Sequence, residues 1–310
     1  MSRRSAIRYM LTASAGLLFP PLRSSWAWKK DADPDFTLHS EVRLVLLDVS
    51  VKDRRGVPVS GLSMDNFAVF ENGRERLISV FAKDDTPVTV GVLVDESESM
   101  RTKRADVLAA AQTFVQESNP KDEIFILNFN DVVTRGLPPR KLYSDDVREL
   151  REALNRAVPR GKTALNDAVV EGLNLLQPGT RGRRALVLIS DGGDNASQHR
   201  RDEVIDLIQS RLATVYAVGL YDLTERETNP GFLRQLAKVS GGQAYFPHQP
   251  TEVGDVCRRI ARDIRARYTL GYVPGPGEAL RHISVKATAP DRQGLVARTR
   301  TTYRYDTHAQ

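Results

Sequence analysis

Five oxygen-bearing side chains in three separate segments have the types and positions needed to hold one divalent cation. Asp95, Ser97 and Ser99 follow one apolar, strand-like run, Asp191 follows another, and Thr163 stands in a loop before a helical pattern. Two carboxylates and three hydroxyls are hard oxygen ligands, which suit a Mg²⁺-like ion that keeps some of its waters. Because so few of these ligands are charged, the ion could accept a carboxylate from outside the chain. The pattern therefore predicts a docking site.

The surrounding pattern indicates how three distant segments would meet. From residue 88 onward, apolar strand-like runs alternate with amphipathic helical spacings. The sequence predicts strands over residues 88–94, 123–129, 185–190, 214–220 and 243–246. It predicts helices over residues 107–115, 147–158, 165–176 and 253–264. This alternation favours an α/β fold with a doubly wound, mainly parallel sheet, whose ligand sites lie at the carboxyl ends of the strands. Asp95 and Asp191 stand at two such ends.

The two flanking parts of the chain have the pattern of strands without helices. In the N-terminal β segment, residues 36–85, apolar residues alternate along positions 45–51, and Asn72-Gly73 suits the tight turn of a hairpin. The C-terminal β segment, residues 267–305, returns to strand-like runs around a Pro-Gly-Pro-Gly loop. We expect the two segments to pair into a β-sandwich-like module, with the α/β domain, residues 86–266, inserted between them.

The order of the chemical groups resembles that of a known family. Asp-x-Ser-x-Ser after an apolar strand, then Thr before a helix, then Asp after a further strand, resembles the metal-ion-dependent adhesion site of von Willebrand factor type A domains. This resemblance covers about residues 88–265. Over about residues 36–303 the chain is also similar to a bacterial family of exported von Willebrand factor A-related proteins, through stretches such as Thr163-Ala-Leu-Asn-Asp167 and Ser190-Asp-Gly192.

The resemblance implies a Rossmann-like von Willebrand factor A fold and a role for each residue of the motif. Ser97 and Ser99 would coordinate the metal through their hydroxyls, and Thr163 would bind directly or through water. Asp95 and Asp191 would act mainly through waters and hydrogen bonds. The expected metal is Mg²⁺ or Mn²⁺ ahead of Ca²⁺. The expected partner is a protein that supplies an Asp or Glu carboxylate to the open coordination position.

The segment around the first strand end departs from the family pattern. Glu98 stands where the family usually has Gly, and Glu96 stands two residues before it. A carboxylate turned inward would occupy the vacant metal position, whereas two carboxylates facing solvent would only make the rim acidic. We expect both to face solvent. Asp167 would either support the metal shell or act as an ordinary first-turn acid of its helix, and the first amides of that helix are expected to point at the site.

The first 27 residues have the pattern of an export signal. Arg3 and Arg4 begin a basic region, an uncharged stretch follows over residues 9–22, and residues 25–27 form a small-x-small cleavage site. The paired arginines favour the twin-arginine route, with an ordinary secretory signal as the alternative. The expected location is the periplasm, the cell surface or the exterior. A membrane is expected to be involved only if the signal stays uncleaved.

Charge, cysteine content and histidine spacing argue against several other functions. The formal charge falls from +6 to +2 without the four arginines of residues 1–27, so nothing favours nucleic acid as a partner. The lone Cys257 excludes an intrachain disulfide, and the five histidines lack the spacing of zinc ligands. Arg258, Arg262 and Arg265 share one helical face, which we interpret as a solvated stripe rather than an anion-binding patch.

Three functions fit these observations. The leading hypothesis is an exported, non-enzymatic, metal-dependent protein-binding module that serves adhesion or scaffolding. The second is a structural scaffold that never binds metal. The third is a metal-assisted hydrolase, but the chain has no paired nucleophile and base, no Gly-x-Ser-x-Gly elbow and no phosphate-binding P-loop.

Overall fold

The structure is a computed structural model that describes residues 44–83, 86–156, 158–220 and 228–304. The predicted export signal over residues 1–27 lies outside the described residues, as does the start of the N-terminal β segment over residues 36–43. None of the helices in the described part of the chain is long and apolar enough to cross a membrane.

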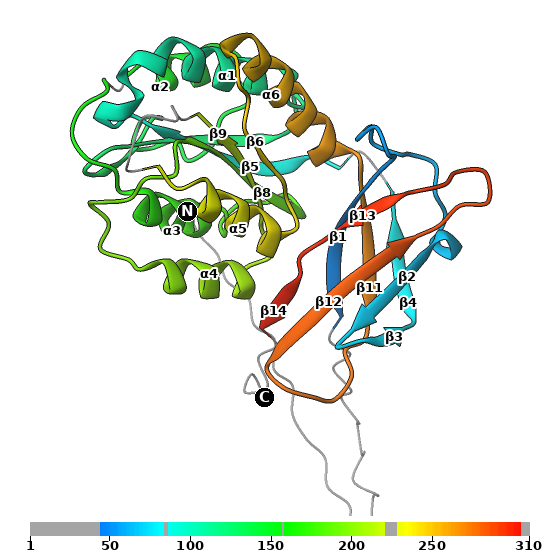
Figure 1. Ribbon diagram of the computed structural model, residues 1–310. Helices are drawn as coiled ribbons and strands as arrows, with labels where there is room; N and C mark the ends of the chain where they lie inside the picture. The colour runs from blue at the N-terminus through cyan, green and yellow to red at the C-terminus, as the bar shows by residue number, and fades with distance from the viewer. Residues whose placement is uncertain (1–43, 84–85, 157, 221–227, 305–310) are drawn as a thin grey trace, which may run out of the picture. The chain divides into compact units, whose positions relative to one another are not determined.

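A six-stranded sheet forms the centre of the α/β part, with the order β10-β9-β8-β5-β6-β7 (Figure 1). Its strands are β5 (Val88–Asp95), β6 (Glu123–Phe129), β7 (Val133–Arg135), β8 (Arg183–Ser190), β9 (Thr214–Gly219) and β10 (Ala244–Tyr245). All neighbours are parallel except β7, which pairs antiparallel with β6 at one edge. The predicted doubly wound, mainly parallel sheet is therefore confirmed.

Helices cover both faces of this sheet, as Figure 1 shows. The helices are α1 (Arg104–Glu117), α2 (Val147–Asn155), α3 (Leu165–Leu175), α4 (Arg201–Ser210), α5 (Pro230–Ser240) and α6 (Pro250–Arg265). One apolar core contains side chains of α1, α2 and α6, and the other contains side chains of α3, α4 and α5. Successive residues of β5 alternate between the two cores, with Val92 in the first and Leu93 in the second.

The remaining strands form two four-stranded sheets with the orders β13-β1-β11-β4 and β14-β12-β2-β3. These strands are β1 (Val45–Lys52), β2 (Phe67–Glu71), β3 (Arg74–Arg76), β4 (Ile78–Ala82), β11 (Arg267–Tyr272), β12 (Leu280–Ala287), β13 (Val296–Arg298) and β14 (Thr302–Arg304). β1 pairs antiparallel with β11, and β2 pairs antiparallel with β12. Both sheets contribute to one apolar core, so strands from before and after the α/β part form one β module. The remaining elements are the short 3-10 turns η1 (Met64–Asn66) and η2 (Glu98–Lys103).

The boundaries of several elements differ from the sequence expectation. α2 ends at Asn155, and Val158, which was expected on its apolar face, is 68% exposed. The residue before a proline is disfavoured in the helical conformation, and Pro159 follows Val158. The hairpin at Asn72-Gly73 forms as predicted, with φ of 49° and 77° at the two turn residues.

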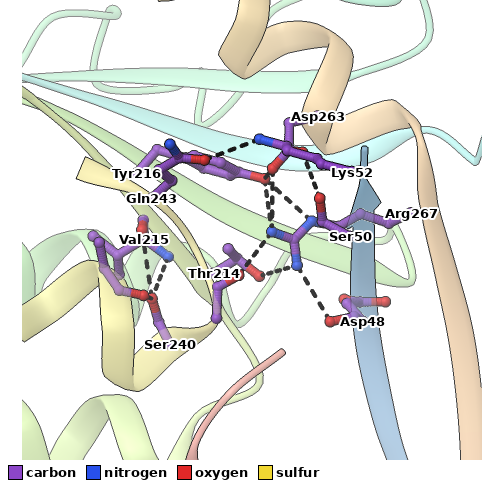
Figure 2. Close-up of polar contacts among 12 residues, drawn as sticks. Asp48, Ser50, Lys52, Thr214, Val215, Tyr216, Ser240, Gln243, Asp263 and Arg267 are labelled. Atoms are coloured by element: carbon purple, nitrogen blue, oxygen red, sulfur yellow. Dashed lines mark hydrogen bonds and ion pairs between the residues drawn. The ribbon is translucent and has the colours of Figure 1, made fainter. Parts of the chain in front are cut away.

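A buried polar network joins α6 to β1 and β9 (Figure 2). The Asp263 carboxylate accepts hydrogen bonds from Ser50 Oγ at 2.5 Å and Tyr216 OH at 2.6 Å, and lies 2.9 Å from Lys52 Nζ. Arg267, at the start of β11, donates to Tyr216 OH at 2.7 Å and lies 3.6 Å from the Asp263 carboxylate. A buried charge needs such partners to be tolerated, and this network attaches the end of α6 and the start of β11 to β1 and β9.

Candidate metal centre

Two neighbouring parallel strands bring the acidic residues to one edge of the sheet. The register of β5 and β8 pairs Val94 with Ile189, so Asp95 at the end of β5 lies next to Ser190 at the end of β8. Asp191 follows directly after β8. Asp95 is 1% exposed and Asp191 is 3% exposed, so both carboxylates are buried.

Four of the five predicted residues lie in one hydrogen-bonded cluster. Asp95 accepts from the Ser97 amide at 3.0 Å and from the Ser190 hydroxyl at 2.6 Å. The hydroxyls of Ser97 and Ser99 are 3.1 Å apart. The Ser99 hydroxyl donates to the Asp191 carboxylate at 2.7 Å. The loops after β5 and β8 are therefore joined through the side chains that the sequence singled out.

The loop of Thr163 is attached to both of the other loops through its main chain. The Thr163 amide donates to the Asn195 side chain at 2.8 Å, and the Thr163 carbonyl accepts from the Asn195 amide at 3.0 Å. On the other side, the Glu98 amide donates to the Gly161 carbonyl at 3.1 Å. The Thr163 hydroxyl makes no hydrogen bond to any residue that the structure describes. The three loops are thus bonded pairwise, and Thr163 reaches the cluster by its loop rather than by a side-chain contact.

Burial and charge make the carboxylate pair unfavourable in the absence of a cation. Burial raises the pKa of Asp95 most, and the nearby charge of Asp191 raises it further, to about 7. Hydrogen bonds from Ser190 and Ser97 oppose this rise only in part. A divalent cation beside both carboxylates would remove the repulsion. The electrostatics and the oxygen donors of the cluster therefore fit a metal of the Mg²⁺ type.

The expectation that both rim glutamates face solvent is wrong for Glu96. Glu96 is 2% exposed and forms an ion pair with Arg104 at the start of α1. Burial raises the pKa of Glu96, and Arg104 limits the rise. The side chain of Glu98 is 56% exposed and pairs with Arg101 at 2.7 Å, as a solvent-facing rim residue would. The arginine on the helix after the loop, which the local pattern did not indicate as a partner, explains why Glu96 turns inward.

The start of α3 is fastened to the loop after β8. The Asn166 amide donates to the Asp194 carboxylate at 2.8 Å, and the Asp167 amide donates to the Ser197 hydroxyl at 3.2 Å. The Asp167 carboxylate in turn accepts from the His199 amide at 2.9 Å. These two amides of α3 are therefore used within the fold, contrary to the expectation that the first amides point at the site. Asp167 lies in the first turn of α3, as the alternative of a first-turn acid predicted, and its carboxylate also anchors the loop that contains His199.

Sequence reasoning missed two residues that hold the cluster together. Ser190 was noted only as part of a family motif, yet its hydroxyl binds Asp95 and also accepts from the Gly192 amide at 3.0 Å. Asn195 was not among the predicted site residues, and its side chain accepts a hydrogen bond from the Thr163 amide. The available signal was the position of Ser190, which is the last residue of its strand and directly precedes Asp191. A hydroxyl at this position can reach the end of the neighbouring strand, where Asp95 lies.

Comparison with known proteins agrees with this geometry. Residues 90–193 match the family model of the von Willebrand factor type A domain. The sheet order and the helices on both faces agree with the Rossmann-like fold of that family, and the match includes both Asp95 and Asp191.

Two solved structures show the same fold. A von Willebrand factor type A protein from Catenulispora acidiphila is 14% identical, with 78% of this chain and 74% of that chain covered and a TM-score of 0.52. Proximal thread matrix protein 1 from the mussel byssus is 12% identical, with 63% of this chain and 51% of that chain covered and a TM-score of 0.50. At these identities the likeness concerns the fold alone.

Proposed function

We propose that this protein is an exported, non-enzymatic protein-binding module whose binding depends on a divalent metal. The residues that would hold the metal are the five identified from the sequence, namely Asp95, Ser97, Ser99, Thr163 and Asp191. The observation that carries the proposal is the Ser99–Asp191 hydrogen bond of 2.7 Å, because it brings ligand types from two distant loops into one cluster.

The chemistry of the donor set supports Mg²⁺ or Mn²⁺ ahead of Ca²⁺. Hydroxyls and two carboxylates are oxygen donors with little total charge. When bound, the metal would supply an open coordination position for a carboxylate from outside the chain. The protein's own residues would position the ion, with Ser97 and Ser99 as direct ligands and Asp95 and Asp191 as acceptors that balance its charge.

The rim of the site bears on the kind of partner. Glu98 and Arg101 lie exposed beside the cluster and pair with each other, so the acidic group at this rim is partly neutralised. An Asp or Glu of a partner protein could approach without meeting an unpaired rim carboxylate from Glu98. We infer that an acidic side chain of a protein partner completes the site. The proposed export rests on the pattern of residues 1–27.

One observation favours the alternative of a scaffold that binds no metal. The hydroxyl and carboxylate groups of the cluster already bind one another, so the loops can be held together without an ion. Metal dependence of partner binding separates the two functions. No specific observation favours a hydrolase.

Affinity capture from the envelope fraction of the producing cells tests the proposal. Wild type, Ser97→Ala and the control Ser60→Ala would be compared in Mg²⁺ and in chelator; Ser60 is exposed in the β module. We expect wild type and Ser60→Ala to retain a partner in Mg²⁺ and to release it in chelator, and Ser97→Ala to retain none. Retention of the same partner by Ser97→Ala in chelator would establish the metal-free scaffold instead.

A further inference from the structure

A second site, outside the metal centre, is a cavity with an unusual concentration of positive charge. It has a volume of about 440 Å³ and lies among the turn after β1, helix α6 and strands β10 and β13. A single acidic residue, Asp53, lines it, whereas the cationic residues that line it are Lys52, Arg54, Arg55, Arg259, Arg262 and Arg298. Like charges gathered around one cavity repel each other unless an anion lies between them.

The positive charges of the arginines in this wall have no acidic partner in the described part of the chain. Within residues 44–83, 86–156, 158–220 and 228–304, the side chains of the five arginines form no ion pair and no hydrogen bond. The Asp53 carboxylate accepts from the amides of Arg55 at 2.8 Å and Val57 at 2.9 Å, so it serves the turn. The one acidic side chain of the wall is thus already engaged by main-chain donors.

The cavity is built on fixed groups as well as exposed arginines. Lys52 is 8% exposed, and its Nζ lies 2.9 Å from the Asp263 carboxylate and 3.0 Å from Gln243 Oε1. Figure 2 shows Lys52 among these residues. Arg54 lies across Gly294, where a Cβ would come within 2.2 Å of Arg54 Nε and where φ is 71°. The glycine therefore leaves the space that the Arg54 side chain occupies.

The lowered pKa of Lys52 agrees with a concentration of positive charge around the cavity. Burial lowers the pKa of Lys52, its ion pair with Asp263 opposes this effect, and the charge of Arg298 lowers the pKa further. Arg298 lines the same cavity. Two cations of the wall therefore lie close enough to act on each other, and one anion between them would stabilise both.

We propose that this cavity binds a phosphoryl group carried by a small molecule. A phosphoryl group bears close to two negative charges and three acceptor oxygens, and guanidinium groups bind it through paired hydrogen bonds. A single carboxylate would offset only one of the charges. The volume lies within the range of roughly 300–1,000 Å³ that is usual for small-molecule sites, so a phosphorylated compound fits better than a bare inorganic ion.

The sequence placed Arg262 in a solvated stripe with Arg258 and Arg265, and the structure shows Arg262 exposed. Arg262 lines the cavity together with Arg259, whereas the neighbouring Arg258 pairs with Asp255 on the same helix. Arg258 thus provides a matched control, because it has the same charge and lies on the same helix but outside the cavity wall.

Calorimetric titration with inorganic diphosphate tests the site. The full chain, kept at constant ionic strength in chelator, would be compared with Arg259→Gln, Arg262→Gln and Arg258→Gln. We expect saturable 1:1 binding that weakens about tenfold or more in Arg259→Gln and in Arg262→Gln, as loss of a charged hydrogen bond would cause. Arg258→Gln should change the affinity less than about twofold. Unchanged melting temperatures without ligand would show that the variants fold.

A second arm identifies the source of the phosphoryl group. Vesicles that contain phosphatidic acid would be compared with phosphatidylcholine vesicles in co-sedimentation. Binding of diphosphate alone supports a soluble phosphate compound, whereas binding to phosphatidic acid vesicles that Arg259→Gln abolishes supports a lipid headgroup. Absence of both, or equal loss of binding in Arg258→Gln, would overturn the proposal. Ser97→Ala should bind diphosphate normally, so failure of the metal centre and failure of this site are distinguishable.

Discussion

The Ser99 hydroxyl donates a 2.7 Å hydrogen bond to the Asp191 carboxylate across 92 residues of sequence. This contact joins the loop after β5 to the loop after β8. The Ser97 hydroxyl lies 3.1 Å from that of Ser99, so three of the expected metal ligands follow one another within the cluster. The metal hypothesis and the stability of the two loops therefore depend on the same atoms.

Replacement of Ser99 by Ala should weaken the stabilisation of the protein by Mg²⁺. A ligand present at 100 times its Kd stabilises the folded state by about 2.7 kcal/mol, which corresponds to a rise of several degrees in melting temperature. Ser99→Ala removes one hydroxyl ligand and should reduce this rise to less than about half. Thermal melting with and without Mg²⁺ measures the difference, and Ser60→Ala should behave as wild type. An equal rise in Ser99→Ala would remove Ser99 from the metal centre.

Asp191→Asn should separate metal binding from the stability of the metal-free protein. The charge of Asp191 contributes to the raised pKa of Asp95, so its removal relieves a repulsion between buried carboxylates. We expect the free energy of unfolding of the metal-free variant to be no more than about 0.5 kcal/mol below that of wild type. The Mg²⁺-induced rise should fall to about half or less. A variant that is both strongly destabilised and stabilised by Mg²⁺ as much as wild type would contradict this account.

The positions of the central strands could be predicted because these strands are continuous apolar runs. β6 was predicted over residues 123–129, and the structure has it at Glu123–Phe129. α4 and α5 were not predicted, although Leu233 and Leu236 of α5 are fully buried. The signal for α5 is short and begins at a proline, which sequence reasoning did not use as a helix start. β7 has no buried residue, so burial left no pattern to recognise.

A methyl group at Gly192 should disrupt the loop after β8. Gly192 has φ of 85°, and a Cβ there would lie 2.5 Å from the carbonyl oxygen of Asn229, which is main chain and cannot turn away. Gly61 has φ of 86° with no atom within 4 Å of such a Cβ, so Gly61→Ala isolates the conformational cost.

The two alanine variants should therefore differ in stability. We expect Gly61→Ala to lose about 1–2 kcal/mol, which is the left-handed penalty alone, and Gly192→Ala to lose clearly more because of the added clash. Urea unfolding measures both. Gly192→Ala should also bind Mg²⁺ more weakly, since Asp191 directly precedes it. Equal losses of stability would show that the main chain yields easily at this position.

The buried Asp263 should make the free energy of unfolding decrease at acidic pH. Burial raises the pKa of Asp263, but the charges of Arg267 and Lys52 and the hydrogen bonds from Ser50 and Tyr216 outweigh burial and lower it. Because the folded-state pKa lies below the unfolded value of about 3.9, the stabilisation is complete above that pH. It is lost as the pH falls through the folded-state pKa.

Asp263→Asn provides the comparison. At pH 7 the variant should be about 3 kcal/mol or more less stable, since it leaves two buried cations without their carboxylate. The gap from wild type should stay constant down to about pH 5 and narrow below about pH 4. Unfolding free energies across this range give the result. A gap that stays the same at every pH would mean that Asp263 acts through its shape alone.

The types of residue in the metal centre were visible in the sequence, but the contacts among them were not. Asp95 and Ser190 meet only because β5 and β8 pair in a particular register, which is a tertiary property. Glu96 turned inward because Arg104 begins the helix that follows, a partner that a local motif comparison does not consider. Residue types thus indicate the chemistry, whereas strand register decides which groups contact one another.

Calorimetric titration of Mg²⁺ and Mn²⁺ into metal-free protein tests the central claim most directly. We predict one site per chain in wild type, about tenfold or more weaker binding in Ser97→Ala and Asp191→Asn, and unchanged binding in Ser60→Ala. Absence of saturable binding of either ion to wild type at millimolar concentration, with the fold intact, would contradict the claim that these three loops form a metal centre.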